Sequence, residues 1–92
     1  MYAQVLTEGT TPDTCGELDA AIRDRLLPEL RVQEGFSGAL HLVRRQTGEA
    51  MLVVFWETED QATRAPSLPE FAGLAPAASG ERSSVWEVTQ RA

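Results

Sequence analysis

The feature that most constrains the fold of this chain is an unbroken apolar run over residues 50–56. Successive side chains of a β-strand point to opposite faces of the sheet. A strand with one solvated face therefore alternates apolar and polar residues, and this run does not alternate. Its two faces would carry Met51, Val53 and Phe55 on one side and Leu52, Val54 and Trp56 on the other. Each such side chain stabilises a fold by about 1.5–3 kcal/mol when fully buried, so we expect both faces to be covered.

Four segments have the composition of strands. We expect strands over residues 2–7, 36–44, 50–57 and 82–89, which are rich in β-branched and aromatic residues. The second and third are joined by the polar turn Arg45-Gln46-Thr47-Gly48-Glu49. Two strands joined by a short polar turn that contains glycine predict a β-hairpin.

An amphipathic helix is predicted between the first two strands, with Asp13 or Thr14 as its N-cap. Pro28 predicts a kink or a restart, because proline lacks an N–H group and clashes with the preceding helical turn. Gly35 is expected to end this region. The apolar stripe of the helix recurs every four residues, at Leu18, Ile22, Leu26 and Leu30.

A second helix is expected from about residue 58 to residue 65, and the prolines of residues 66–69 should break it. We expect a short helical turn over residues 69–74 and a loop of small residues over 75–80. Residues 66–80 are interpreted either as a lid over a pocket or as an ordinary surface loop. On the first helix, Asp19 and Arg23 are expected to form an i,i+4 ion pair on the solvated side.

The predicted order is therefore β-α-β-β-α-β. Two β-α-β halves with right-handed crossovers form a four-stranded antiparallel sheet with both helices on one face, the ferredoxin-like α+β fold. We expect a single domain over residues 1–92. The doubly apolar third strand then predicts that a second copy of the chain covers the open sheet face, because an exposed apolar face would be adhesive.

Charge and composition exclude several classes of partner. The net charge is −6, and all eight basic residues are arginines without a cluster. Neither a nucleic acid nor an anionic membrane is therefore an expected partner. The one cysteine, Cys15, lies among acidic neighbours that disfavour a thiolate, so we interpret it as a small packed thiol. The chain has no signal-peptide pattern and no apolar run of membrane-spanning length, so we expect a cytoplasmic protein.

Several short motifs resemble a known family. These are Gly35-Phe36-Ser37-Gly38 at the start of the second strand, Thr47-Gly48-Glu49 in the hairpin, and Phe55-Trp56-Glu57-Thr58 before the second helix. With the element order, they resemble the antibiotic biosynthesis monooxygenase-like domain of the dimeric α+β barrel superfamily. The resemblance covers nearly the whole chain, and best residues 20–65. It implies a ferredoxin-like fold that dimerises through its sheet.

The resemblance also implies a type of chemistry. Cofactor-free members oxygenate electron-rich phenols such as anthrones and hydroquinones, and the deprotonated substrate itself passes an electron to dioxygen. Such a reaction needs a dry aromatic pocket, a proton acceptor and donors for a developing oxyanion, without a cofactor or a metal. The haem-degrading branch has an asparagine on the first strand and a histidine on the second helical segment. This chain has Gln4 or Thr7 on that strand and no histidine in residues 58–80, which argues against haem degradation.

Two residues are candidates for catalysis. His41, the only histidine, is either the general base or a strand histidine that forms a hydrogen bond at the sheet or dimer face. Trp56 matches the position at the end of the third strand where the family often carries a tryptophan. It either lines the pocket and donates its indole N–H to a substrate oxygen, or simply packs in the core.

Four further residues are candidates for substrate binding. Tyr2, Phe55 and Trp86 could complete an aromatic lining, and packing in the core or an interface is the alternative. Gln4 could orient a substrate or pair across the sheet. The function expected is a cofactor-independent monooxygenase or related oxidoreductase that acts on a small aromatic or polyketide-like molecule. The alternative is a non-catalytic homodimeric module that binds a small hydrophobic ligand or has a structural or regulatory role.

Overall fold

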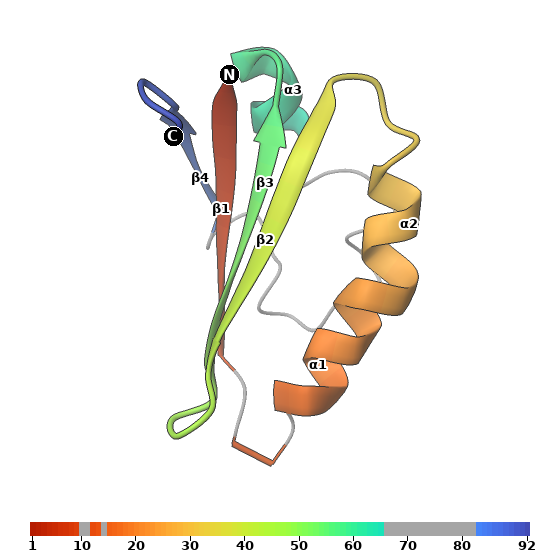
Figure 1. The fold of residues 1–92 in the computed structure, drawn as a ribbon, viewed down its shortest axis with the longest axis vertical. Coiled ribbons are helices and arrows are strands. Elements are labelled where there is room, and N and C mark those ends of the chain that lie inside the picture. The colour runs from red at the N-terminus through yellow and green to blue at the C-terminus, as the bar shows by residue number, and fades with distance from the viewer. Residues whose placement is uncertain (10–11, 14, 66–82) are drawn as a thin grey trace.

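The computed structural model describes residues 1–9, 12–13, 15–65 and 83–92. Its strands form one four-stranded sheet in the order β2-β3-β1-β4, and every neighbouring pair is antiparallel. This is the ferredoxin-like α+β arrangement predicted from the sequence (Figure 1). In chain order the elements are β1 (Tyr2–Gly9), α1 (Cys15–Ala21), the π-helical segment η1 (Ile22–Leu26), α2 (Leu27–Leu30), β2 (Phe36–Arg44), β3 (Glu49–Trp56), α3 (Glu59–Arg64) and β4 (Ser83–Glu87).

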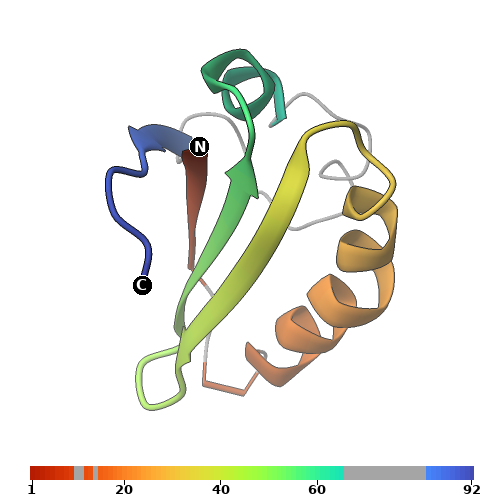
Figure 2. The same ribbon diagram turned by 45° about the horizontal axis from the view of Figure 1, so that its top comes forward.

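The first helical region is continuous but changes its winding before Pro28. The Leu27 N–H bonds to the Ile22 carbonyl five residues back, which makes η1 a π-helical segment. A new α-helical turn, α2, then carries Pro28 in its first turn, where a missing N–H costs little. Pro28, where a kink or a restart was expected, thus lies just after a change of winding within a continuous helical region. Figures 1 and 2 show α1 and α2 as one column beside β2, on the opposite side from the C-terminal end of the chain.

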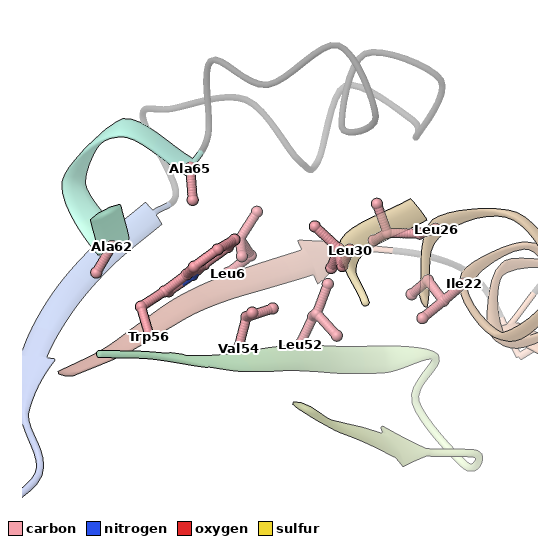
Figure 3. Close-up of a cluster of buried hydrophobic side chains, with 9 residues drawn as sticks. All are labelled: Leu6, Ile22, Leu26, Leu30, Leu52, Val54, Trp56, Ala62 and Ala65. Atoms are coloured by element: carbon pink, nitrogen blue, oxygen red, sulfur yellow. The ribbon is translucent and has the colours of Figure 1, made fainter. Parts of the chain in front are cut away.

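The register between β1 and β3 decides which side chains share a face. Leu6 lies opposite Leu52, and Tyr2 lies opposite Trp56. This face is covered by the helices, and its buried side chains form the core (Figure 3). The core cluster consists of Leu6, Ile22, Leu26, Leu30, Leu52, Val54, Trp56, Ala62 and Ala65.

The other face of the sheet is partly bare. Phe55 and Val53 are half-buried there, and Met51 is exposed. Part of the cover comes from the chain's own C-terminal segment, since the Arg91 guanidinium lies 5.0 Å from the centre of the Phe55 ring. Exposed apolar side chains nonetheless spread across this face on three strands: Leu40, Leu42, Met51 and Trp86. We call this the open face.

Element limits differ little from those expected. β1 continues to Gly9, β3 begins and ends one residue earlier, and β4 ends at Glu87 rather than at residue 89. The first helical region ends at Leu30, and turns lead from there to Gly35, where its end was expected. The predicted helical turn at 69–74 and the lid or loop at 66–80 lie outside the described residues. No helix within the described residues is both long and apolar enough to cross a membrane.

Candidate functional site

A buried polar pair lies at the end of the covered face. The Trp56 indole N–H donates a hydrogen bond of 3.0 Å to Oε1 of Gln4. Gln4 is 0% exposed and Trp56 is 2% exposed. The Nε2 group of Gln4 is also buried and has no hydrogen-bond partner among the described residues. A buried donor without a partner costs about 1–3 kcal/mol, so this amide marks a place where a ligand or water would be stabilised.

The chain that follows Trp56 is held by a capping box. Thr58 Oγ1 accepts a hydrogen bond from the Gln61 backbone N–H, and Gln61 Oε1 accepts one from the Thr58 N–H, each at 3.1 Å. The Glu57 N–H donates to the Gly35 carbonyl at 2.9 Å, which ties the end of β3 to the start of β2. These contacts set the direction in which α3 leaves the sheet next to Trp56.

A small hollow of about 180 Å³ opens beside Trp56, between α3 and the turn before β2. The Trp56 ring is also packed edge to face with Phe36, at 6.1 Å between ring centres and 78° between planes. Asp60 and Arg64 form an ion pair of 3.2 Å on α3. The hollow is lined by Gln33, Glu34, Trp56, Asp60, Gln61, Arg64 and Ala65.

His41 lies on the same covered face, toward the middle of β2. Its Nδ1 lies 2.7 Å from Asp19 Oδ1 on α1, and its side chain is only 7% exposed. His41 pairs with Leu52 across the sheet, four residues before Trp56 on β3, which separates the two by roughly 13 Å. At this separation the two predicted catalytic residues are not in contact.

The predicted binding residues divide between the two faces. Tyr2 lies opposite Trp56 on the covered face. Its pKa is raised above the usual value chiefly by the negative charge of Glu87, so its phenol stays a neutral donor. Phe55 and Trp86 lie on the open face, on either side of Ala3. Trp86 is 62% exposed, and its indole N–H donates to Ser84 Oγ at 2.8 Å.

One expected ion pair is wrong. Asp19 pairs with His41 instead of Arg23, and Arg23 pairs with Asp24 at 2.9 Å. Sequence spacing could not reveal the Asp19–His41 contact, since it joins residues on different elements. The hollow beside Trp56 was also missed, although the Thr58-x-x-Gln61 capping pattern was a signal that places Gln61 there.

No cluster of three or more histidine, cysteine or acidic side chains suited to a metal ion occurs among the residues that the structure describes. The hollow beside Trp56 offers amide, carboxylate and guanidinium groups to a ligand next to an indole ring.

Comparison with solved structures identifies the class of fold. The chain is similar to a monooxygenase from the gene ActVA-Orf6 of Streptomyces coelicolor, solved in complex with nanaomycin D (21% identity, TM-score 0.67, 99% of this chain and 88% of that chain). It is also similar to SnoaB, a cofactor-independent oxygenase from Streptomyces nogalater (20% identity, TM-score 0.54, 98% of this chain and 91% of that chain). No family model and no curated protein sequence matches the chain.

These likenesses establish the fold. The chain has the α+β fold of antibiotic biosynthesis monooxygenase-type proteins, as the resemblance in sequence predicted. Identities near one residue in five do not transfer a reaction, because one fold hosts many activities.

Proposed function

We propose that this protein is a cofactor-independent oxygenase that acts on a small electron-rich aromatic compound. The observation that carries the proposal is the Gln4 amide, whose oxygen is held by the Trp56 indole and whose buried NH₂ group has no partner among the described residues. A preorganised donor of this kind suits an oxyanion that develops during reaction. Two oxygenases with the same fold support the assignment.

The chemistry balances without a cofactor. A phenolate passes one electron to dioxygen, and the resulting substrate radical and superoxide combine to form a C–O bond. Loss of water from the hydroperoxide then leaves a carbonyl. For a hydroquinone, substrate and dioxygen become a hydroxyquinone and water, so that one oxygen atom enters the product and the other leaves as water.

Trp56 contacts both Gln4 and the hollow, whereas Gln4 itself does not line the hollow. The Trp56 N–H holds Gln4, and the Trp56 ring lines the hollow. Donation of this N–H to a substrate oxygen, as the sequence suggested, would require the bond to Gln4 to break. Glu34 and Asp60 line the same hollow and are available as acceptors for substrate hydroxyl groups. His41 has no part in this proposed reaction, and its role as a base remains a prediction.

Oxygen consumption with a panel of hydroquinones and anthrones tests this function. We expect uptake by the wild-type protein and a fall of about 10²-fold in the Gln4→Leu variant, the usual effect of removing one oxyanion donor. Val32→Ala should keep the wild-type rate, because Val32 is 79% exposed and does not line the hollow.

A double variant separates chemistry from folding. Gln4→Leu alone leaves the buried Trp56 N–H without a hydrogen-bond acceptor. The double variant Gln4→Leu/Trp56→Phe removes both partners and therefore leaves no new unpaired buried polar group. A folded double variant without uptake supports the proposal. Wild-type uptake in Gln4→Leu would refute the role of Gln4.

The separation of His41 from Trp56 favours a second candidate, a non-catalytic module that binds a small ligand, because it leaves the hollow without a histidine base. A ligand that binds the native state raises the melting temperature whether or not it reacts. Ligand-induced stabilisation without oxygen uptake across the panel would support this second function.

We infer further that a second copy of the chain covers the open face. Leu40, Leu42 and Met51 are exposed there beside a hollow of about 450 Å³, which the Arg44–Glu49 ion pair of 3.4 Å borders. Burial of these apolar side chains between two sheets would contribute to the stability of a dimer. Phe55 and Trp86 would then lie at the interface.

A further inference from the structure

A second buried polar group lies on β4, next to Gln4. In the register of β1 and β4, Ser83 lies opposite Leu6, and Gln4 lies opposite Val85. Directly opposite residues of an antiparallel pair share a face, so Ser83 points to the covered face, as Gln4 does. The Ser83 hydroxyl oxygen is buried and, like Gln4 Nε2, forms no hydrogen bond with any residue that the structure describes.

The two groups are close enough to share one partner atom. Ser83 and Gln4 are diagonal neighbours on adjacent strands, and such neighbours lie about 7–8 Å apart, with their Cβ atoms somewhat closer. Two donors that bond to the same oxygen atom are at most about 6 Å apart, since each hydrogen bond measures about 2.7–3.0 Å. The long side chain of Gln4 can span the difference.

The contact with Trp56 orients the Gln4 amide. The indole on β3 holds Oε1, and the oxygen and nitrogen of an amide point apart, so this bond turns Nε2 away from Trp56. β1 lies between β3 and β4 in the sheet. The unpaired NH₂ group therefore faces the side of β1 on which Ser83 lies.

Apolar surroundings strengthen hydrogen bonds at this place. The cross-strand partners of the two groups include Leu6 and Val54, both 0% exposed. The small side chains of Ala62 and Ala65 on α3 cover this end of the sheet (Figure 3). In a setting of low polarity, a hydrogen bond to a charged oxygen is stronger than in water. An amide N–H and a hydroxyl are both suitable donors for such an oxygen.

We propose that the Gln4 amide and the Ser83 hydroxyl hold one oxygen atom between them as that atom gains negative charge during oxygenation. This assignment rests on the proposed function, and it adds Ser83 as a second donor. Two oxygens of the reaction fit the description: that of the substrate phenolate, and that of the superoxide formed when dioxygen accepts an electron. Both donors keep their protons and act through hydrogen bonds alone.

The Ser83→Ala variant separates this role from a structural one. Loss of an unpaired buried hydroxyl should leave the melting temperature unchanged or slightly raised. Oxygen uptake should nevertheless fall about 10²-fold, the usual effect of removing one oxyanion donor. Ser83→Thr, which keeps a hydroxyl group, should retain most of the uptake. A lower melting temperature of Ser83→Ala with unchanged uptake would overturn the proposal.

Thr63→Ala is the control for loss of a hydroxyl group. Thr63 is exposed on α3, so this variant should keep the wild-type uptake. An equal fall of uptake in Thr63→Ala and Ser83→Ala would overturn the assignment to Ser83.

Two measurements identify the source of the oxygen. 4-Nitrophenol absorbs strongly at visible wavelengths only as its phenolate, so a pH titration under nitrogen reports the pKa of the bound probe. If the substrate phenolate is the source, the wild-type protein lowers this pKa, and Ser83→Ala weakens phenolate binding about tenfold without changing the binding of the neutral phenol. If superoxide is the source, Ser83→Ala leaves this pKa unchanged and lowers kcat/KM for dioxygen about tenfold or more.

The outcomes distinguish the two-donor site from the proposed function. Phenolate binding that depends on Ser83, in a protein without oxygen uptake, upholds the site and refutes the oxygenase. Uptake that Gln4→Leu abolishes and Ser83→Ala leaves intact upholds the oxygenase and refutes the site. Absence of both uptake and a preference for the phenolate in the wild-type protein refutes both.

Discussion

At the scale of single residues, Gly35 shows how the absence of a side chain shapes the candidate site. Its φ of +84° lies in the left-handed region that glycine adopts without strain. A Cβ built at this position would collide with the Gln61 amide, which closes the capping box. The Gly35 carbonyl also accepts the Glu57 N–H at 2.9 Å. One residue thus lets the turn before β2 approach the end of β3 closely.

The first residue-scale prediction concerns Gly35→Ala. We expect it to lower the free energy of unfolding by about 2 kcal/mol or more, because the left-handed conformation alone costs alanine roughly 1–2 kcal/mol. Gly16→Ala is the matched control. Gly16 lies in α1 with nothing near its missing Cβ, so alanine there should stabilise by about 0.5–1 kcal/mol. Urea denaturation measures both, and a Gly35→Ala midpoint equal to that of the wild type would contradict the account.

At the scale of elements, α3 is a helix of six residues that could not persist alone. Its stability comes from its N-terminal capping box and from Ala62 and Ala65, which pack into the core. Because α3 carries Asp60, Gln61 and Arg64, its position also sets one wall of the hollow. The cap therefore contributes to the site as well as to the fold.

Thr58→Ala removes the cap and should lower the free energy of unfolding by about 0.5–2 kcal/mol. Thr63→Ala is the control within the same helix, since Thr63 is exposed and does not cap it. Chemical denaturation followed by circular dichroism distinguishes the two. Identical midpoints for the two variants would show that the capping box does not stabilise the protein.

At the scale of the whole molecule, the sheet has one face covered by helices and one face bare. The C-terminal segment covers the bare face near Phe55, where the Arg91 guanidinium stacks on the ring. Figure 2 shows the C-terminal end on the side of the sheet away from the α1–α2 column. The apolar residues nearer the hairpin, among them Leu42 and Met51, are left exposed.

We expect a homodimer in native mass spectrometry and a monomer after Leu42→Glu, because a buried charge without a partner would oppose association. Val32→Glu should leave the dimer intact, since Val32 lies in the turn after α2 and is already exposed. A monomeric wild-type protein at micromolar concentration would contradict the inference that a second copy covers the apolar open face of β3. That result would not contradict the fold.

Most of the fold was accessible from the sequence. Strand-type composition, the period-four apolar stripe, and cap and turn residues located the described strands and helices, with the largest error at the end of the first helical region. Pro28 and the Thr58 cap act on backbone within a few residues of themselves, so their effects could also be predicted from the sequence. The candidate site was less accessible. Trp56 and Gln4 were both singled out, but their contact was not, and the aromatic residues expected to act together lie on opposite faces.

What the sequence determined by itself is therefore the set of elements, their order and the apolar character of both faces of β3. These follow from interactions between residues a few positions apart. Only the tertiary structure decided which polar groups meet: Trp56 with Gln4, and His41 with Asp19. Those contacts depend on strand register and helix placement, which the packing of the whole core selects. A shift of one residue in the register of β1 would turn Gln4 to the open face and break its hydrogen bond with Trp56.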